Sequence, residues 1–258
     1  MKFLALDTAT EACSAAVLVD GNVVERFEVL GRGYAERLLP MVQEVLAEGG
    51  VALSALDAIA FGRGPGSFTG LRIGAGITQG LAFGAGLRVV PVSDLAALAS
   101  QAAMASGHTH VLACLDARMA QVYWAAYDCS DPAAPRALTP EAVANPEDVW
   151  LPENGDKNGD IPIFLSGPDG TAGAAQKIGK KECPLFLGAG HGFSAYPALH
   201  TMLGERLAGF DAGLLPHARE IALIAAREVA RGGGVDPELA VPVYLRDEVA
   251  HRRGQAPR

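Results

Sequence analysis

The chain has 258 residues, half of them hydrophobic, and a formal net charge of −8. This length and hydrophobic content suffice for one large domain or two modest lobes with a substantial core. The negative net charge argues against a chain that binds RNA by itself, because such chains normally carry a basic stripe. Here basic residues cluster only at the C-terminal end.

The N-terminal stretch does not have the pattern of a signal peptide, since Asp7 and Glu11 interrupt it. No segment is long and apolar enough to span a bilayer. The four cysteines are scattered without a C-x-x-C pair, which is typical of reduced thiols. We therefore expect a cytoplasmic protein without a membrane partner.

Predicted strands and helices alternate through the first 106 residues, which favours an α/β lobe. The expected strands are 3–7, 13–19, 23–29, 56–61 and 88–92, and the expected helices are 35–48, 71–86 and 94–105. Pro40 falls near the expected start of the first helix, where proline is tolerated. Ser93 is expected to cap the third helix.

The second part of the chain opens as the first does. Leu4-Ala5-Leu6-Asp7 is followed by a turn and a strand, and Ala113-Cys114-Leu115-Asp116 is followed by a turn and the expected strand 121–127. This indicates a duplicated strand–acid–hairpin unit, although two unrelated hairpins would look alike. We predict an N-terminal lobe over 1–106, a C-terminal lobe over 107–212, and a helix and tail over 213–258 that pack back on the first lobe.

The sequence patterns that predict the later elements are weaker. We expect an exposed loop at 153–160, strands at 161–166 and 185–190, a helix at 217–231 and an extended segment at 241–246. Pro242 places that last segment at a surface or a sheet edge, because proline cannot donate to a strand ladder.

The most informative stretch is the glycine-rich turn Gly62-Arg63-Gly64-Pro65-Gly66-Ser67-Phe68-Thr69-Gly70-Leu71-Arg72, between a predicted strand and a predicted helix. Such a turn can hold an anion, because the first amides of a helix lack partners. It has no P-loop lysine and does not fit G-x-G-x-x-G. A tight turn that seats the helix is therefore favoured over a phosphate cradle.

Three other turns are candidate phosphate sites. Ala9 and Arg118 stand where two of them would require glycine for close approach of a phosphate, whereas the turn after residue 187 keeps its glycines. The candidate nucleotide-binding residues are Asp7, Thr8, Gly188 and Gly190. No H-x-x-x-H pair and no G-x-S-x-G elbow occurs, so neither a metal site nor a catalytic residue is predicted.

Gly76, Gly80 and Gly84 recur every four residues and share one helix face. Each costs about 0.5–1 kcal/mol relative to alanine, so the stripe indicates that another backbone approaches, either a partner's or that of the lobe's own sheet. The helix over 35–48 has a wider apolar arc than one sheet-facing stripe requires, and surplus apolar surface often binds a partner. The candidate interface residues are Leu38, Leu39, Met41, Val42, Val45, Leu71, Ile73, Gly76, Ile77, Gly80 and Gly84.

Taken in order, five segments resemble the bacterial TsaB (YeaZ) family: 4–14, 37–42, 60–74, 115–119 with 122–124, and 242–246. They span almost the whole chain, and the glycine-rich block is highly specific. The resemblance is thinnest between residues 132 and 181. Tyr34 stands where relatives often carry histidine, which weakens any role for an imidazole there.

The resemblance implies a two-lobed α/β fold like that of actin and sugar kinases (ASKHA), with a duplicated sheet. It also implies a part in making threonylcarbamoyladenosine beside the anticodon of ANN-decoding tRNAs. In that pathway TsaD is the catalytic subunit, TsaE is an ATPase that joins the complex, and TsaB is a non-catalytic partner that binds through its first two helices.

The same resemblance implies no catalytic residue, and no cofactor except ATP or ADP held in the complex. Contact with tRNA would come only through that complex, and two copies would pair through the same helices as a homodimer. The alternative is an ATP-dependent or peptidase-like enzyme of the same fold.

Overall fold

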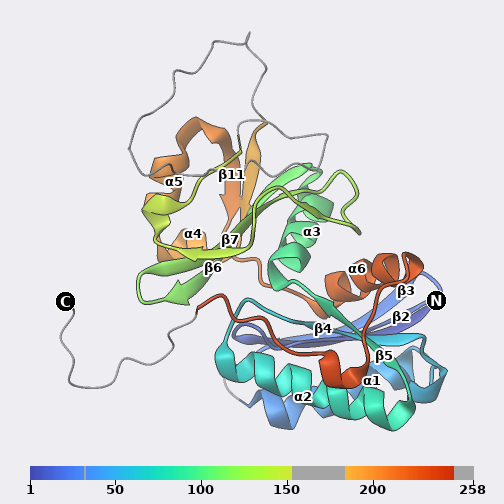
Figure 1. Ribbon diagram of the computed structural model, residues 1–258. Coiled ribbons are helices and arrows are strands. Elements are labelled where there is room, and N and C mark those ends of the chain that lie inside the picture. The colour runs from blue at the N-terminus through green and yellow to red at the C-terminus, as the bar shows by residue number, and fades with distance from the viewer. Residues whose placement is uncertain (32, 153–183, 247–258) are drawn as a thin grey trace, which may run out of the picture.

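The computed structural model describes residues 1–31, 33–152 and 184–246. Two β-sheets form the framework, one in each part of the chain, with helices outside and between them (Figure 1). Over the described ranges, no helix has both the length and the hydropathy needed to cross a bilayer.

The first sheet has the strand order β3-β2-β1-β4-β5. Its strands are β1 Lys2–Asp7, β2 Ala12–Val19, β3 Asn22–Val29, β4 Ala58–Gly62 and β5 Arg88–Val92. The first three strands are antiparallel neighbours, whereas β4 runs parallel to both β1 and β5.

The second sheet has the order β11-β10-β6-β7-β8, with β9 also on β7. Its strands are β6 His110–Arg118, β7 Gln121–Asp128, β8 Arg136–Ala137, β9 Ala142–Ala144, β10 Phe186–Ala189 and β11 Leu207–Asp211. Again an antiparallel hairpin is followed by two strands parallel to its first member. The repeated topology confirms the duplicated two-lobed α/β fold.

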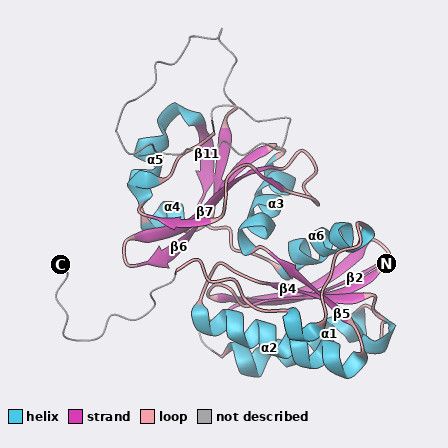
Figure 2. Cartoon of the chain, viewed as in Figure 1, coloured by secondary structure: helices cyan, strands magenta, loops and turns pink. Residues whose placement is uncertain are grey.

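The helices cover the sheets in layers (Figure 2). They are α1 Tyr34–Glu48, α2 Phe68–Ala85, α3 Asp94–Ser106, α4 Gly192–Ala195, α5 Ala198–Leu203 and α6 Ala218–Ala230, with short 3₁₀ turns at Leu53–Ala55, Pro146–Asp148, Gly204–Arg206 and Pro237–Leu239. Helices α1 and α2 lie on the outer face of the first sheet. Helix α6 lies on its inner face, and α3 lies between α6 and the second sheet.

The alternation of β1 shows how this layering follows from sequence. Phe3 and Ala5 point into a core shared with α3, α6 and the second sheet, while Leu4 and Leu6 point into the core under α1 and α2. Successive side chains of a strand face opposite sides, so one buried strand supplies both cores. The inner core spans both lobes and holds them together.

Several boundaries differ from expectation. Helix α2 begins at Phe68, three residues early, because the Ser67 hydroxyl accepts a hydrogen bond from the Gly70 amide at 3.4 Å and caps the helix. Pro40 is not in the first turn of α1 but inside the helix, which continues past it. The Ser93 cap is confirmed, with the Ala96 amide 3.2 Å from its hydroxyl.

The remaining predictions concern the lobe boundaries and the later part of the chain. The loop at 153–160 and the strand at 161–166 lie outside the described residues. The lobe boundaries at 106 and 212 stay a prediction; helix α6 lies against β1 and β2 of the first sheet. The segment 241–246 forms no strand in the structure.

Candidate functional site

The glycine-rich turn packs directly against the turn that follows β1. The Ser67 amide donates to the Ala9 carbonyl at 2.6 Å, and the Thr8 hydroxyl donates to the Gly70 carbonyl at 2.7 Å. Added Cβ atoms at Gly66 and Gly70 would collide with the carbonyl oxygens of Ala9 and Thr8. Glycine is required at both positions because two backbones touch there.

This packing occupies three of the amides of the glycine-rich turn. The Gly64 amide donates to an oxygen of Asp94 at 2.5 Å, and the Ser67 and Gly70 amides already have protein acceptors. A phosphate cradle requires free, convergent amides. The geometry therefore favours the interpretation of this turn as the seat of α2.

An inter-lobe cleft of about 570 Å³ opens beside this turn. Its walls are the turn after β1, the glycine-rich turn, the β6–β7 hairpin, His191, and the C-terminal segment 243–246. Tyr34, at the start of α1, also lines it. The cleft is open rather than plugged by Arg118, whose side chain is 83% exposed and pairs with Asp116 at 2.9 Å.

Polar groups from both lobes meet across this cleft. The His191 Nδ1 atom accepts a hydrogen bond from the Asp116 amide at 3.2 Å, so a proton on the neutral ring must sit on Nε2. That Nε2 atom lies 3.6 Å from a Glu11 oxygen of the other lobe. Burial lowers the pKa of His191, against the opposing influence of the Glu11 and Asp116 carboxylates.

The segment 240–246 runs along one side of α2 and reaches the second lobe. The Gln79 amide group donates to the Ala240 carbonyl at 3.1 Å, and the Val243 amide donates to the Arg63 carbonyl at 2.7 Å. At its far end, Arg246 donates to the Gln121 side chain at 2.6 Å. This segment is a strap that joins the first lobe to the β6–β7 hairpin.

None of the four candidate nucleotide-binding residues lines the cleft. Asp7 and Thr8 are buried at the turn that follows β1, which we call the first turn. A Cβ at Gly188 would lie 2.5 Å from the Phe193 ring, and one at Gly190 would collide with the Cys114 carbonyl. Their binding of a nucleotide stays a prediction, and the geometry gives them no direct access to the cleft.

The candidate interface residues divide into two groups. Five of them are buried, four in the core under the first sheet and Leu71 beside the cleft: Leu38, Met41, Val42, Val45 and Leu71. The sequence predicts surplus apolar surface on α1. This prediction is wrong for Leu38, Met41, Val42 and Val45, because α1 packs against both the sheet and α2, and these contacts bury its wide apolar arc. Of the candidate residues on α1, only Leu39 is exposed, at 43%.

The glycine stripe of α2 belongs to the second group. Gly76, Gly80 and Gly84 are exposed, and an added Cβ at any of them meets no atom of the residues that the structure describes within 4 Å. Packing on the lobe's own sheet is therefore not the reason for these glycines. Ile73 and Ile77 beside them are half-buried. We call Leu39, Ile73, Gly76, Ile77, Gly80 and Gly84 the outer face.

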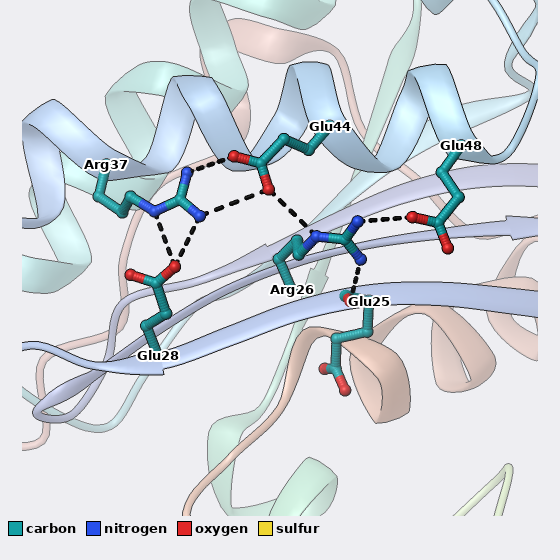
Figure 3. Close-up of polar contacts among 6 residues, drawn as sticks. All are labelled: Glu25, Arg26, Glu28, Arg37, Glu44 and Glu48. Carbon is teal, nitrogen blue, oxygen red and sulfur yellow. Dashed lines mark hydrogen bonds and ion pairs between the residues drawn. The ribbon is translucent and has the colours of Figure 1, made fainter.

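An ion-pair network fixes α1 to β3 (Figure 3). Arg37 binds Glu28 and Glu44, each at 2.6 Å, and Arg26 binds Glu44 at 3.1 Å and Glu48 at 2.5 Å. Hydrogen bonds from Arg37 lower the pKa values of Glu28 and Glu44. Leu39 lies about 200° around the helix from Arg37, so these charges stay off the outer face.

Sequence reasoning missed several exposed or polar residues here. Phe83, 79% exposed, lies three residues after Gly80 and was detectable from helical spacing. Glu11 and His191 meet only through folding. Tyr244 accepts a hydrogen bond from Arg72, which also lies 3.8 Å over the Phe68 ring. No local pattern joins residues so far apart in sequence.

The structure gives no sign of a metal centre in its described parts, where no three His, Cys, Asp or Glu side chains gather closely enough to hold an ion. Cys13, Cys114 and Cys129 are free and buried. Burial raises the pKa of the Cys13 and Cys129 thiols to about 12. Such thiols are protonated and unreactive at neutral pH.

Comparison with known proteins places these features in context. The family model TsaD, described as tRNA N6-adenosine threonylcarbamoyltransferase, matches residues 28–253. The chain is 42% identical to the tRNA threonylcarbamoyladenosine biosynthesis protein TsaB of Escherichia coli K12, with 98% of each chain covered. It is 35% identical to the TsaB of Haemophilus influenzae, with 98% of this chain and 97% of that one covered. The solved structure of YeaZ from Pseudomonas aeruginosa superposes with a TM-score of 0.78 at 43% identity, covering 95% of this chain and 99% of that one.

Proposed function

This chain belongs to the TsaB (YeaZ) family, within the wider TsaD-like family, and on that premise we propose that it takes part in threonylcarbamoyladenosine modification of tRNA. Its role is that of a non-catalytic subunit which binds a TsaD-like catalytic subunit in the cytoplasm. The modified base is the adenosine beside the anticodon of ANN-decoding tRNAs. A TsaE-like ATPase joins the complex, and tRNA is contacted only through it.

The single observation that carries the partner role is the open glycine stripe of α2. Glycine inside a helix costs stability, and none of the described residues uses the space that the missing side chains leave. A partner helix laid along the stripe would approach the α2 backbone closely, flanked by Leu39, Ile73 and Ile77. Phe83 would supply an aromatic anchor.

The composition of the outer face supports the same role. None of its six residues is charged, and the charges of α1 at Arg37, Glu44 and Glu48 are engaged by the ion-pair network or turned toward β3. Interface centres are depleted in charged residues. In the absence of a partner, two copies of the chain would pair through the same face.

The test replaces Gly80 with leucine. Gly80→Leu keeps the isolated chain folded, because space is free at that position, but its side chain stands where the partner backbone must approach. We expect co-purification with the TsaD-like subunit of the same organism to be lost, or affinity to fall at least about tenfold. Threonylcarbamoyladenosine in tRNA should fall in parallel, as measured by mass spectrometry of nucleosides.

The matched control is Ala105→Leu, which adds a leucine to an exposed position of α3, away from the outer face. It should leave complex formation unchanged. Undiminished binding by Gly80→Leu would count directly against the outer face as the interface.

A second candidate function is that of an ATP-dependent or peptidase-like enzyme. The observation that favours it is the open inter-lobe cleft with Glu11, Asp116 and His191 on its walls. Calorimetry with ATP and ADP on the isolated chain separates the two functions. Micromolar binding with turnover would establish the enzyme and overturn the non-catalytic role, whereas no binding and no turnover is the result that we expect.

A further inference from the structure

Two buried carboxyl groups meet under the glycine-rich turn. Asp7 ends β1 and Asp94 begins α3, and their side chains are 1% and 0% exposed. Between them stands Gly62, where an added Cβ would lie 2.7 Å from an Asp7 oxygen and would collide with an Asp94 oxygen. The missing side chain at Gly62 lets the two carboxyl groups approach.

Each carboxyl group holds one backbone segment. Asp7 Oδ1 accepts from the Ala9 amide at 2.9 Å, in the first turn. Asp94 Oδ2 accepts from the Gly64 amide at 2.5 Å, and the Asp94 amide donates back to the Gly64 carbonyl at 3.0 Å. The pair therefore connects the first turn to the glycine-rich turn.

The remaining oxygens, Asp7 Oδ2 and Asp94 Oδ1, are buried without a donor. The side chains lie within hydrogen-bond reach of each other. Two ionised carboxylates cannot share a dry site without a strong penalty, and one proton between them gives both groups a partner. The pKa of Asp7 is raised to about 6 by burial, and that of Asp94 is raised well above its usual range by burial and by the Asp7 charge.

No nearby cation is dedicated to the pair among the described residues. His217, just before α6, acts on Asp7 from a distance, and Arg63, after β4, acts on Asp94. His217 is engaged by Glu25 at 3.2 Å, and Arg63 is engaged by Glu141 at 3.0 Å. From β2 and α1 the pair is faced by the Cys13 thiol and the Tyr34 phenol, which are neutral and have pKa values raised by burial.

We propose that Asp94 stays protonated at neutral pH and donates a hydrogen bond to ionised Asp7, so that one shared proton ties the first turn to the glycine-rich turn. This hydrogen bond fixes the position of the start of α2. It is a structural use of the acid that ends β1, and it does not depend on the proposed partner role.

The sign of the pH dependence follows from the retained proton. In the unfolded chain an aspartate titrates near about 4, so above that pH the native state binds protons that the unfolded state has released. The stabilising contribution is complete below about pH 4 and is lost as pH rises. The part of this stabilisation that comes from Asp7 is lost by about pH 6. Above pH 6, the proton that Asp94 retains in the native state makes the equilibrium constant of unfolding rise about tenfold per pH unit.

The experiment compares the full chain with Asp94→Asn, whose amide can donate to Asp7 and whose oxygen can accept from Gly64. Urea unfolding is measured between about pH 6.5 and 8.5. We expect the wild-type unfolding constant to rise about tenfold per pH unit relative to the variant. Asp236→Asn, at an exposed position, should run parallel to the wild type. Parallel curves for Asp94→Asn and wild type would overturn the proposal.

A second measurement needs no variant that folds. Carboxyl ¹³C resonances of the intact chain are followed from about pH 4 to 9, and the shared-proton pair predicts one buried aspartate that keeps its proton above pH 7. If all buried aspartates were ionised at pH 7, the proposal would be wrong.

Discussion

The two strand–acid–turn units of this molecule have the same topology and opposite uses. In the first lobe, Asp7 is buried and its turn is covered by the glycine-rich turn. In the second lobe, Asp116 lies on the cleft, where it accepts hydrogen bonds from Tyr196 at 2.8 Å and from the Arg118 amide at 2.7 Å. The first unit builds the fold, and the second forms a wall of the cleft.

The difference comes from the segments that cover each hairpin. In the first lobe a glycine-rich turn and the long helices α1 and α2 cover the outer face of the sheet, whereas the described residues on the corresponding face of the second sheet form the short helices α4 and α5. Backbone at the second hairpin stays open, and Arg118, Met119 and Ala120 all adopt positive φ angles, of 62°, 54° and 59°. A repeated topology therefore does not repeat a site, since the covering segments decide which acid meets solvent.

The largest effect that would sharpen this comparison is expected at adjacent leucines of α1. Leu38→Ala removes a fully buried side chain and should lower the free energy of unfolding by about 3 kcal/mol, within the usual 2–5 range. Leu39→Ala should change it by less than about 0.5 kcal/mol and instead weaken partner binding. Urea denaturation and a pull-down assay measure the two effects. Equal losses of stability would show that α1 does not separate core from outer face as described.

A smaller effect is expected from alanine at two glycines of α2. Gly70→Ala would press a methyl group into the Thr8 carbonyl and should destabilise the chain by about 2–3 kcal/mol. Gly80→Ala meets no described atom within 4 Å and should stabilise the chain by about 0.5–1 kcal/mol through helix propensity. Thermal unfolding of both variants provides the measurement. Stabilisation by both would mean that the first turn does not touch the glycine-rich turn.

The smallest effect concerns the open hairpin. Ala120→Gly should stabilise the chain by about 0.5–1 kcal/mol, because glycine adopts a positive φ without the steric penalty of a Cβ. Gly21→Ala, in the turn between β2 and β3 at φ 93°, should have the opposite sign. Denaturant unfolding of the pair checks this. A loss of stability in Ala120→Gly would argue against stored strain at the cleft.

Much of the fold was predictable from sequence because it depends on local patterns. The apolar run of the buried strand β1, the turn at Asp20-Gly21 and the Ser93 cap all depend on neighbouring residues. The repeated acid after a strand predicted the duplicated sheet. The outer face was predicted only in part, because a helical arc shows that residues share a side and not how many elements pack against it.

The sequence alone determined the two-lobed α/β architecture, the family and the special status of the glycine-rich turn, since periodicity, turn chemistry and a specific motif are properties of contiguous residues. Only the tertiary structure decided what each glycine is for. Gly62 admits two carboxyl groups, Gly66 and Gly70 admit the first turn, and Gly76, Gly80 and Gly84 face open space. The physical reason is that the effect of a missing Cβ depends on the atoms that would lie next to it, and only the tertiary structure places those atoms.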